Sequence, residues 1–189
     1  MSDGSGPAPH PYMEQISRVF YNYRLAEFNR RYYAALLRRA GRRILWVQVA
    51  IGLLTAIAVV LFTIPPSMSG DAAKMMMDRL NPIAAVMSAA AFVLNAVAPL
   101  FHWDRTTDEL NARIHAFQFA GDRLESALRF LNHSAQSKRE AELQVQFADE
   151  AYRAAGNLPD TNDQDMKLTK VVRLEVENAI PPDYVWTAL

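Results

Sequence analysis

The sequence predicts an all-α membrane protein, in which an N-terminal basic helix, a two-helix transmembrane hairpin and a cytoplasmic helical domain follow one another. Two apolar stretches, Ile44–Ile64 and Pro82–Trp103, contain no Asp, Glu, Lys or Arg. Apolar residues recur at helical spacing on either side of these stretches. Cysteine is absent, which excludes a disulfide scaffold, a thiolate metal site and cysteine-based catalysis.

The first apolar stretch, Ile44–Ile64, is the stronger of the two candidate membrane spans. Its 21 residues would cover about 30 Å as a helix, which is the thickness of a hydrocarbon core. Pro82–Trp103 is rich in alanine, so a buried helix of a soluble domain is the alternative for this second segment. Trp46 and Trp103 lie near span ends, where indole rings favour the lipid headgroup level, and this placement favours two spans.

Residues 12–43 predict a basic and aromatic cytoplasmic helix that follows a disordered leader at residues 1–11. One interpretation of its arginines is that they anchor the chain on anionic lipids. The other is a site for a phosphorylated ligand, in which arginine forks hold phosphate and tyrosine rings stack on bases. The candidates for ligand binding are Tyr23, Arg30, Arg31, Tyr32, Tyr33, Arg38 and Arg39.

Basic residues are concentrated before the first span. Residues 1–43 hold eight arginines against three acidic residues, whereas residues 65–81 contain only Lys74 and Arg79 as bases. Because positively charged flanks stay in the cytoplasm, we expect both termini there and a short external loop at residues 65–81. Residues 104–189, which hold ten basic and fifteen acidic residues, then face the cytoplasm too.

A heptad seam marks the first part of the cytoplasmic region, residues 104–180. Such a seam needs a partner helix, which either the same chain or another subunit can supply, and spacing alone does not choose between them. We assign it to subunit assembly and expect the region to act in oligomerisation or sensing. The seam residues are Leu110, Ile114, Phe117, Gly121, Leu124, Leu128 and Leu131.

Two further cytoplasmic helices are expected before a tail at residues 181–189. Residues 136–155 have helical periodicity, and Gly156 would end that helix. Residues 166–180 are rich in β-branched side chains, but a strand there would have no second strand to pair with, so a helix is favoured. One side of the helix at residues 136–155 carries Leu143, Phe147, Ala151 and Tyr152.

Polar side chains within the spans share helical stripes with small residues. One interpretation is that these stripes are helix–helix contacts, where small residues allow close approach and amides form interhelical hydrogen bonds. The other is that several subunits turn the stripes toward a central aqueous path, since a single hairpin cannot enclose a pore. The pore-lining candidates are Gln48, Thr55, Ser88, Asn95 and His102.

No catalytic or metal-binding constellation is present in the sequence. The four histidines, His10, His102, His115 and His133, lack the close acidic or cysteine neighbours of a metal site or a triad. The sequence also contains no glycine-rich phosphate loop and no HExxH motif. We therefore expect no enzymatic activity, no metal and no cofactor.

The organisation of the chain resembles the SLATT family of bacterial two-span membrane effectors. The resemblance covers roughly residues 12–180 and is carried by the architecture, without an invariant motif. It rests on the Arg-rich run up to Arg43, the spans ILWVQVAIGLLTAIAVVLFTI and PIAAVMSAAAFVLNAVAPLFHW, and the long helix starting at Asp104.

This resemblance implies a role in antiphage defence, beside a nucleotidyltransferase that makes oligonucleotide signals, and assembly into membrane-disrupting pores. In Hailong-type systems such a channel is paired with an enzyme that produces DNA oligomers. We therefore expect a homo-oligomer, with a tetramer as the first guess, in a bacterial cytoplasmic membrane, depolarising the cell under control of a nucleotide or short DNA oligomer. The alternative is a non-conducting membrane scaffold or adaptor that recruits cytoplasmic partners.

Overall fold

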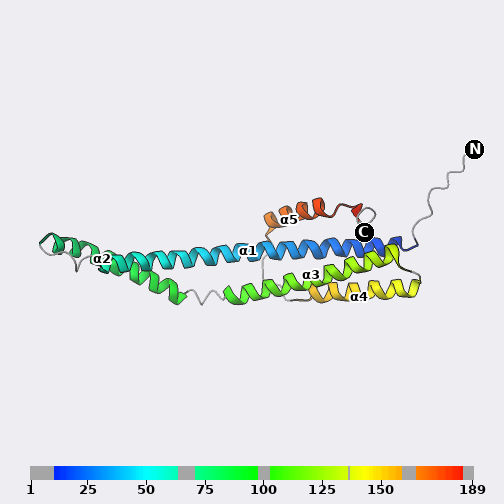
Figure 1. The fold of residues 1–189 in the computed structure, drawn as a ribbon, viewed down its shortest axis with the longest axis horizontal. Coiled ribbons are helices and arrows are strands. Elements are labelled where there is room, and N and C mark those ends of the chain that lie inside the picture. Colours follow the sequence, from blue (N-terminus) through cyan, green and yellow to red (C-terminus); the bar gives the residue numbers. More distant parts are fainter. Residues whose placement is uncertain (1–10, 64–70, 98–102, 136, 159–164, 185–189) are drawn as a thin grey trace, which may run out of the picture. The chain divides into compact units, whose positions relative to one another are not determined.

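The computed structural model describes residues 11–63, 71–97, 103–135, 137–158 and 165–184 (Figure 1). These residues form five α-helices, and no β-strand occurs among them, so the predicted all-α fold is confirmed. The helices are α1 (Met13–Thr63), α2 (Asp71–Val97), α3 (Trp103–His133), α4 (Lys138–Gly156) and α5 (Met166–Ala179). Nearly all of the predicted leader at residues 1–11 lies outside the described residues.

The chain divides into two compact units. The first, which we call the head, comprises Met1–Leu36 and Glu109–Leu189, and the second, which we call the hairpin, comprises Leu37–Asp108. The N-terminal part of α1 belongs to the head and its C-terminal part to the hairpin, while α3 begins in the hairpin and continues in the head. These boundaries separate the functional candidates, because the predicted ligand residues fall on both sides of Leu36.

The predicted basic helix and the first predicted span form one continuous helix, α1, of 51 residues. No proline interrupts it, and Gly41 is the single glycine near the predicted boundary at Arg43. A glycine inside a helix costs about 1 kcal/mol relative to alanine. The neighbouring Leu, Arg and Ala residues are strong helix formers, so the change from basic to apolar sequence does not break the helix.

The predicted external loop at residues 65–81 is wrong for its second half, because α2 begins at Asp71. The sequence DAAKMMMDRL that opens α2 consists mostly of good helix formers, and Pro82 lies within the helix. Residues 65–70 lie outside the described residues. At the C-terminal end of the second predicted span, α2 is described as far as Val97 and α3 from Trp103, and residues 98–102 lie outside the described residues.

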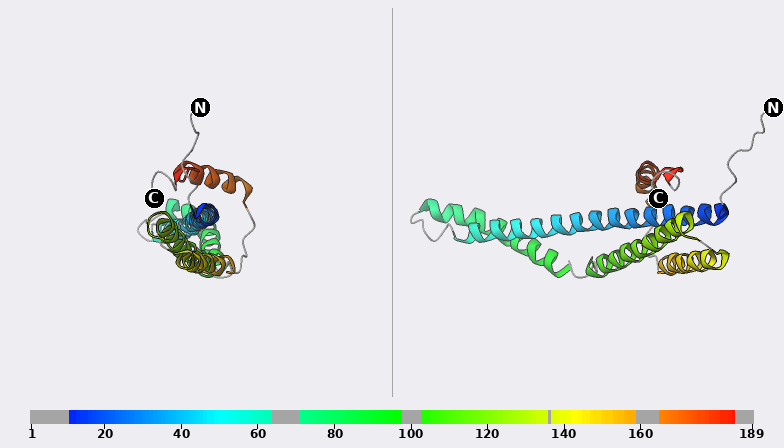
Figure 2. Two further views of the ribbon diagram at one scale, coloured as in Figure 1. Left: turned by 90° about the vertical axis from the view of Figure 1, so that its right-hand side faces the viewer. Right: turned by 45° about the vertical axis from the view of Figure 1, so that its right-hand side comes forward.

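The core of the head forms where α1, α3, α4 and α5 pack together. Figures 1 and 2 show α3 and α4 along one side of the N-terminal part of α1, with α5 on another side. Each helix turns an apolar stripe inward, as expected for amphipathic helices. The largest fully buried side chains are Ile16 and Val19 from α1, Leu110, Leu124, Leu128 and Leu131 from α3, and Val172 from α5.

The heptad seam of α3 packs inside the single chain, which corrects its assignment to subunit assembly. Leu110, Leu124, Leu128 and Leu131 are at most 2% exposed, and Phe117 is 5% exposed. Side chains that are already covered by α1, α4 and α5 cannot present a docking surface to another subunit. The two remaining seam positions, Ile114 and Gly121, are half-buried.

The last two helices begin at side-chain caps. The Ser137 hydroxyl accepts a hydrogen bond from the Glu140 backbone amide at 3.3 Å, which starts α4. The Asp165 carboxylate accepts hydrogen bonds from the backbone amides of Lys167 and Leu168 at 2.9 and 3.0 Å, which starts α5. The predicted helix over residues 166–180 is therefore confirmed.

The buried face of α4 differs from the predicted one. Leu143 and Phe147 are 44% and 57% exposed, whereas alanines and Val145 face the core together with one carboxylate, Asp149. Small inward side chains let α4 approach its neighbours closely, which explains why the large apolar residues are left on the outer side. The buried residues of α4 are Ala141, Val145, Ala148, Asp149 and Ala155.

Candidate functional site

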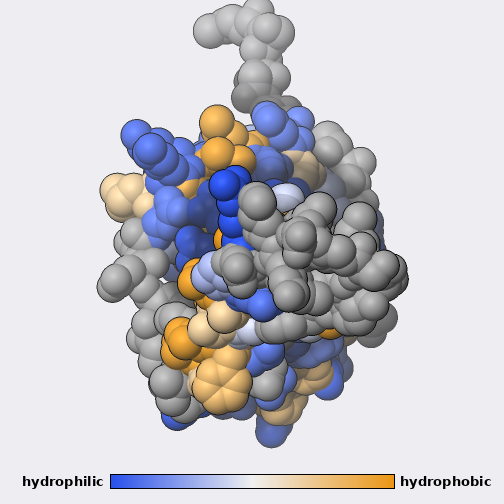
Figure 3. Space-filling view, turned by 90° about the vertical axis from the view of Figure 1, so that its left-hand side faces the viewer, coloured by the Kyte–Doolittle hydropathy of each residue, from blue (hydrophilic) through white to orange (hydrophobic). Residues whose placement is uncertain are grey.

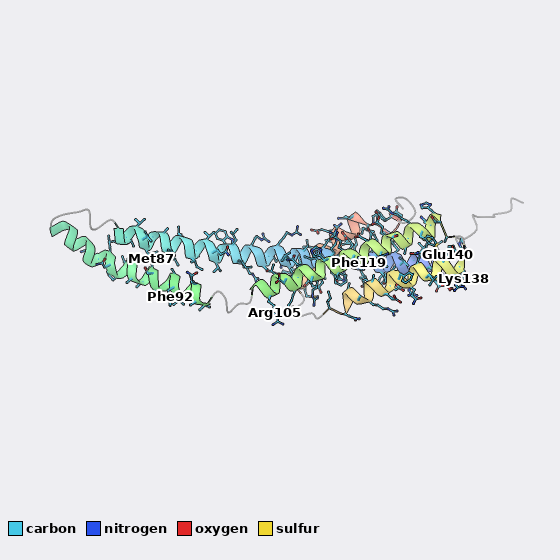
Figure 4. All side chains as sticks on the ribbon, turned by 60° about the horizontal axis from the view of Figure 1, so that its bottom comes forward. Met87, Phe92, Arg105, Phe119, Lys138 and Glu140 are labelled. Carbon is cyan, nitrogen blue, oxygen red and sulfur yellow. The ribbon has the colours of Figure 1, made fainter. Side chains whose placement is uncertain are left out.

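The surface of the hairpin is apolar and exposed. Two helical segments, Met13–Leu61 and Arg79–Val97, contain a window long and apolar enough to cross a membrane, and only 6% and 11% of these windows are buried. The core helix of a soluble protein would be mostly buried, so the low burial favours contact with lipid. Phe92, 73% exposed, projects from α2 (Figure 4). Figure 3 shows hydrophobic residues at the surface of the molecule beside hydrophilic ones.

Small side chains mark the contact between the two helices of the hairpin. Ala58 of α1 is 4% exposed, and Ala84 and Ala91 of α2 are 0% and 5% exposed. Alanine at these positions lets two backbones approach closely, as is typical of helix packing in membranes. Part of the polar stripe on α2 is therefore a helix–helix contact, and Ser88, between the two alanines, is half-buried.

The predicted pore-lining residues differ in how their polar groups are satisfied. The Thr55 hydroxyl donates a 2.9 Å hydrogen bond to the Ile51 carbonyl of its own helix. This hydrogen bond lowers the free-energy cost of placing the hydroxyl in lipid. Gln48 and Asn95 are exposed, and their amides have no hydrogen-bond partner among the described residues. His102 lies outside the described residues.

Two of the predicted ligand-binding tyrosines, Tyr32 and Tyr33, belong to the core of the head, so the prediction that they stack on bases is wrong. They are 7% and 6% exposed. The Tyr33 hydroxyl accepts a 2.5 Å hydrogen bond from Arg113, and its ring stacks on Phe117 at a centroid distance of 5.9 Å. The Tyr32 hydroxyl accepts a 2.9 Å hydrogen bond from the Asp165 backbone amide, which ties α1 to the start of α5.

Arg30 and Arg31 share one carboxylate on their own helix. Arg30 donates to Glu27 from Nε and Nη2 at 2.7 and 2.6 Å, and Arg31 donates from Nε at 2.6 Å. Burial alone would raise the pKa of the Glu27 carboxyl, but the hydrogen bonds from the two guanidiniums lower it below its ordinary value. The hydrogen bond to Glu27 likewise raises the pKa of Arg30.

Three of the predicted ligand residues, Tyr23, Arg30 and Arg31, lie around one cavity of about 370 Å³ in the head. The Tyr23 ring stacks on Tyr184 at 6.5 Å, and burial, followed by the nearby Glu125 carboxylate, raises the pKa of the Tyr23 phenol. Further lining residues include Glu27, Asp122 and Glu125. Because three carboxylates face two arginines that already bind Glu27, this cavity does not favour a polyphosphate.

The other two predicted ligand residues, Arg38 and Arg39, belong to the hairpin and not to the head. Arg38 is exposed and Arg39 is half-buried. The seven predicted residues therefore do not form one site. Three surround the 370 Å³ cavity, two lie in the core, and two lie in the other unit.

An ion pair between Arg18 of α1 and the buried Asp149 of α4 was not predicted from the sequence. The Asp149 carboxylate, in a residue that is 6% exposed, accepts hydrogen bonds from Arg18 Nη2 and, at 3.0 Å, from Asn22 Nδ2. Arg18 and Asn22 lie one helical turn apart, so both reach the same carboxylate. Nothing in the local sequence around Asp149 distinguishes it from the solvated acids of α4.

A second unpredicted feature is a groove between α1 and α5. It has a volume of about 310 Å³, and its lining includes Arg24, Leu25 and Phe28 from α1 and Arg173, Val176 and Glu177 from α5. In the described part of the chain, Arg24 Nε is the one buried side-chain nitrogen or oxygen without a hydrogen-bond partner. A buried donor left without a partner costs about 1–3 kcal/mol of stability. The unpaired Arg24 Nε therefore stands out among the polar atoms of the head.

The geometry defines the class of protein as an all-helical chain with two helices apolar enough to span a membrane and a helical head. Within the described residues, no group of three or more His, Cys, Asp or Glu side chains could hold a metal ion. No protein-family model, curated protein or solved structure matches the chain.

Proposed function

We propose that the chain is a membrane effector whose copies assemble, as a tetramer for example, into a gated pore or ion channel in a bacterial cytoplasmic membrane. Gln48 and Asn95 carry this proposal, because both amides are exposed on the otherwise apolar surface of the hairpin. An amide facing hydrocarbon without a hydrogen bond costs several kcal/mol. Contact with further copies, or with water held between them, would remove this cost.

The assembly surface that fits this proposal is the hairpin. The seam of α3 is covered within the head, as Leu124 and Leu128 at 0% exposure illustrate. Interhelical hydrogen bonds from membrane amides contribute about 0.6–2 kcal/mol each. A ring of hairpins that turns Asn95 inward would combine these contacts with a polar path, whereas a single hairpin encloses no space.

The proposed orientation places both termini in the cytoplasm. Arg38, Arg42 and Arg43 are exposed just before the first span, and positively charged flanks are retained on the cytoplasmic side. Lys74 and Arg79 are the bases of the segment between the two spans. The head would then face the cytoplasm and be accessible to a signal formed there.

The biological setting is a further part of the proposal and rests on the resemblance to SLATT effectors. In that setting, a nucleotide or short DNA oligomer from a neighbouring nucleotidyltransferase opens the pore during phage infection and depolarises the cell. Such a ligand would not stack its bases on Tyr32 and Tyr33, since both rings are buried. Loss of membrane potential on co-expression with such an enzyme, and not with an inactive form of it, is the expected result.

Conductance of the purified chain in planar bilayers tests the pore directly. The wild-type chain is expected to give discrete current steps, and Asn95→Ala is expected to change their size or abolish them. Val86→Ala is the matched control, because Val86 lies on the same helix, is 69% exposed and carries no polar group. Absence of current from assembled wild-type protein would refute the proposed pore function.

The second candidate function is a non-conducting scaffold, and the packing of the hairpin favours it. Ala58, Ala84 and Ala91 are buried at the helix–helix contact, so small residues on these stripes serve packing without any pore. A scaffold would assemble through Gln48 and Asn95 but stay silent in bilayers. Detergent-resistant oligomers that dissociate on Asn95→Ala, combined with zero conductance, would identify this function.

A further inference from the structure

We propose that the groove between α1 and α5 is a binding site for a phosphate monoester with an apolar substituent. In this site the phosphate pairs with Arg24 and Arg173, and the substituent packs on Phe28, Leu25 and Val176. The site lies entirely within the head. It is independent of the proposed pore, since it involves no residue of the hairpin.

The guanidiniums of Arg24 and Arg173 differ from those of three other α1 arginines in lacking a carboxylate partner among the described residues. Arg30 and Arg31 bind Glu27, and Arg18 binds Asp149, so these head arginines already have carboxylate partners. Among the described residues, neither Arg24 nor Arg173 has an ion-pair partner. The Nε of Arg24 is buried and unpaired as well, so the groove contains a donor that lacks an acceptor.

The groove has a net positive charge. Its lining carries two positive side chains, Arg24 and Arg173, and one negative side chain, Glu177, beside the neutral Tyr21. One positive charge remains in excess, and two guanidiniums from two different helices can approach one ligand from two directions. A phosphate monoester carries about 1.5 to 2 negative charges at neutral pH and offers three acceptor oxygens, which suits two arginines better than a monoanionic carboxylate does.

An apolar lining lies beside these charges. Leu25, Phe28 and Val176 supply a hydrophobic wall in a groove of about 310 Å³. Ligand pockets commonly combine such a wall with a few polar groups that fix the orientation of the ligand. A free inorganic phosphate would leave this wall uncovered, so the ligand is expected to carry a ring or a short alkyl chain.

The test is calorimetric titration of the full-length chain in detergent with phenyl phosphate, which combines the two halves of the expected ligand. Phenol and inorganic phosphate serve as the separate halves. Phenyl phosphate is expected to bind about tenfold more tightly than either half, because it uses both the arginines and the apolar wall. Equal affinities for phenyl phosphate and phenol would overturn the proposal.

Three variants connect the binding to the groove. Arg24→Met and Arg173→Gln are each expected to weaken binding about tenfold or more, whereas Arg139→Gln, at an exposed position of α4 outside the groove, is expected to leave it unchanged. Glu177→Gln is expected to tighten binding, since it removes the one negative charge. If Arg24→Met, Arg173→Gln and Glu177→Gln all bind as the wild type does, the assignment is wrong.

Arg24→Met could perturb folding, whereas Arg173 is exposed and its replacement by glutamine should not. Circular dichroism can show that Arg173→Gln retains its helices, so this variant alone decides the test. A parallel titration with dihexanoyl phosphatidic acid separates a lipid headgroup from a soluble ligand. Tighter binding of the lipid supports a membrane source of the phosphate, and tighter binding of phenyl phosphate supports a soluble source. Both results retain the phosphate site, and neither depends on conductance.

Discussion

Replacing Leu128 by alanine tests whether the α3 seam stabilises the head or joins subunits. Leu128 is 0% exposed, with its side chain covered on all sides within the chain. Removing buried methyl groups loses their transfer free energy and leaves a cavity, which together cost about 3–5 kcal/mol for a fully enclosed leucine. We expect the free energy of opening of α3 to fall by this amount in the full-length protein.

The assay is hydrogen–deuterium exchange of the α3 amides in detergent, since the slowest amides report the opening of the head. A loss of about 3–5 kcal/mol accelerates their exchange by roughly two to four orders of magnitude. Leu143→Ala is the matched control, because it makes the same chemical change at a residue that is 44% exposed. The control is expected to cost less than about 1 kcal/mol.

Dependence on protein concentration separates the two roles of the seam. Stability that comes from packing inside one chain does not change with concentration, whereas stability that comes from subunit contact rises with it. We therefore expect the same exchange rates over a hundredfold range of protein concentration. A Leu128→Ala protein that keeps its α3 protection but dissociates into smaller species would refute the burial argument and restore the seam to assembly.

Three further predictions concern the charges of the head, the packing of the hairpin and the orientation of the chain. The pKa of Glu27 is lowered in the folded state, so the stability that this carboxylate contributes is present above its ordinary pKa of 4.5 and is lost as pH falls through the lowered pKa. Glu27→Gln should therefore reduce the loss of unfolding free energy at acid pH, measured by denaturant titrations at several pH values. Ala84→Leu should destabilise the hairpin by about 1–3 kcal/mol because Ala84 is 0% exposed, whereas Ala89→Leu, on an exposed position of the same helix, should be nearly neutral in heat-stability measurements. In inverted membrane vesicles, whose outer face is the cytoplasmic one, an impermeant maleimide should label Ser126→Cys but not Ser67→Cys, and the opposite pattern would reverse the proposed orientation.

The helical fold was predictable where periodicity and length agree. The seam at Leu110, Phe117 and Leu124 predicts a long helix, and the absence of a partner strand predicts a helix over residues 166–180. The loop before Pro82 was predicted to be too long. Pro65-Pro66 and the nearby serines indicate a turn, but the following segment DAAKMMMDRL does not belong to it. In that segment the intrinsic propensity of Ala, Lys and Met decides, and α2 starts at Asp71.

The buried faces were harder to predict, since they depend on contacts between residues far apart in the sequence. On α4 the large side chains of Leu143 and Phe147 suggested the inner face, yet Ala141, Val145 and Ala148 occupy it. Alanine gives a weak periodic signal, although it permits the closest approach of two helices. The size of a side chain alone therefore did not identify the core.

The candidate ligand residues show the same limit. Tyr32 and Tyr33 directly follow Arg30 and Arg31 along α1, a pattern that resembles a stacking platform for bases. Arg113, 80 positions further along the chain, donates to the Tyr33 hydroxyl and lies 4.8 Å from the ring centroid. The residues near Tyr33 in the sequence do not indicate this partner. That both rings point into the core can therefore be seen only in the tertiary structure.

The arginines of α1 divide into groups with different physical roles. Arg18, Arg30 and Arg31 form ion pairs with carboxylates of the head, so they contribute to its packing and little to its net field.

Arg38, Arg42 and Arg43 are exposed in the hairpin unit, directly before the apolar stretch that begins at Ile44. In the proposed orientation, these charges hold their flank in the cytoplasm, because they lie within a few residues of the predicted span and need not break an ion pair to do so. Arg24 belongs to neither group, since its Nε is buried in the head without a partner among the described residues. A run that composition presents as one basic helix therefore combines paired arginines in the head, exposed arginines before the apolar stretch and one buried donor without a partner.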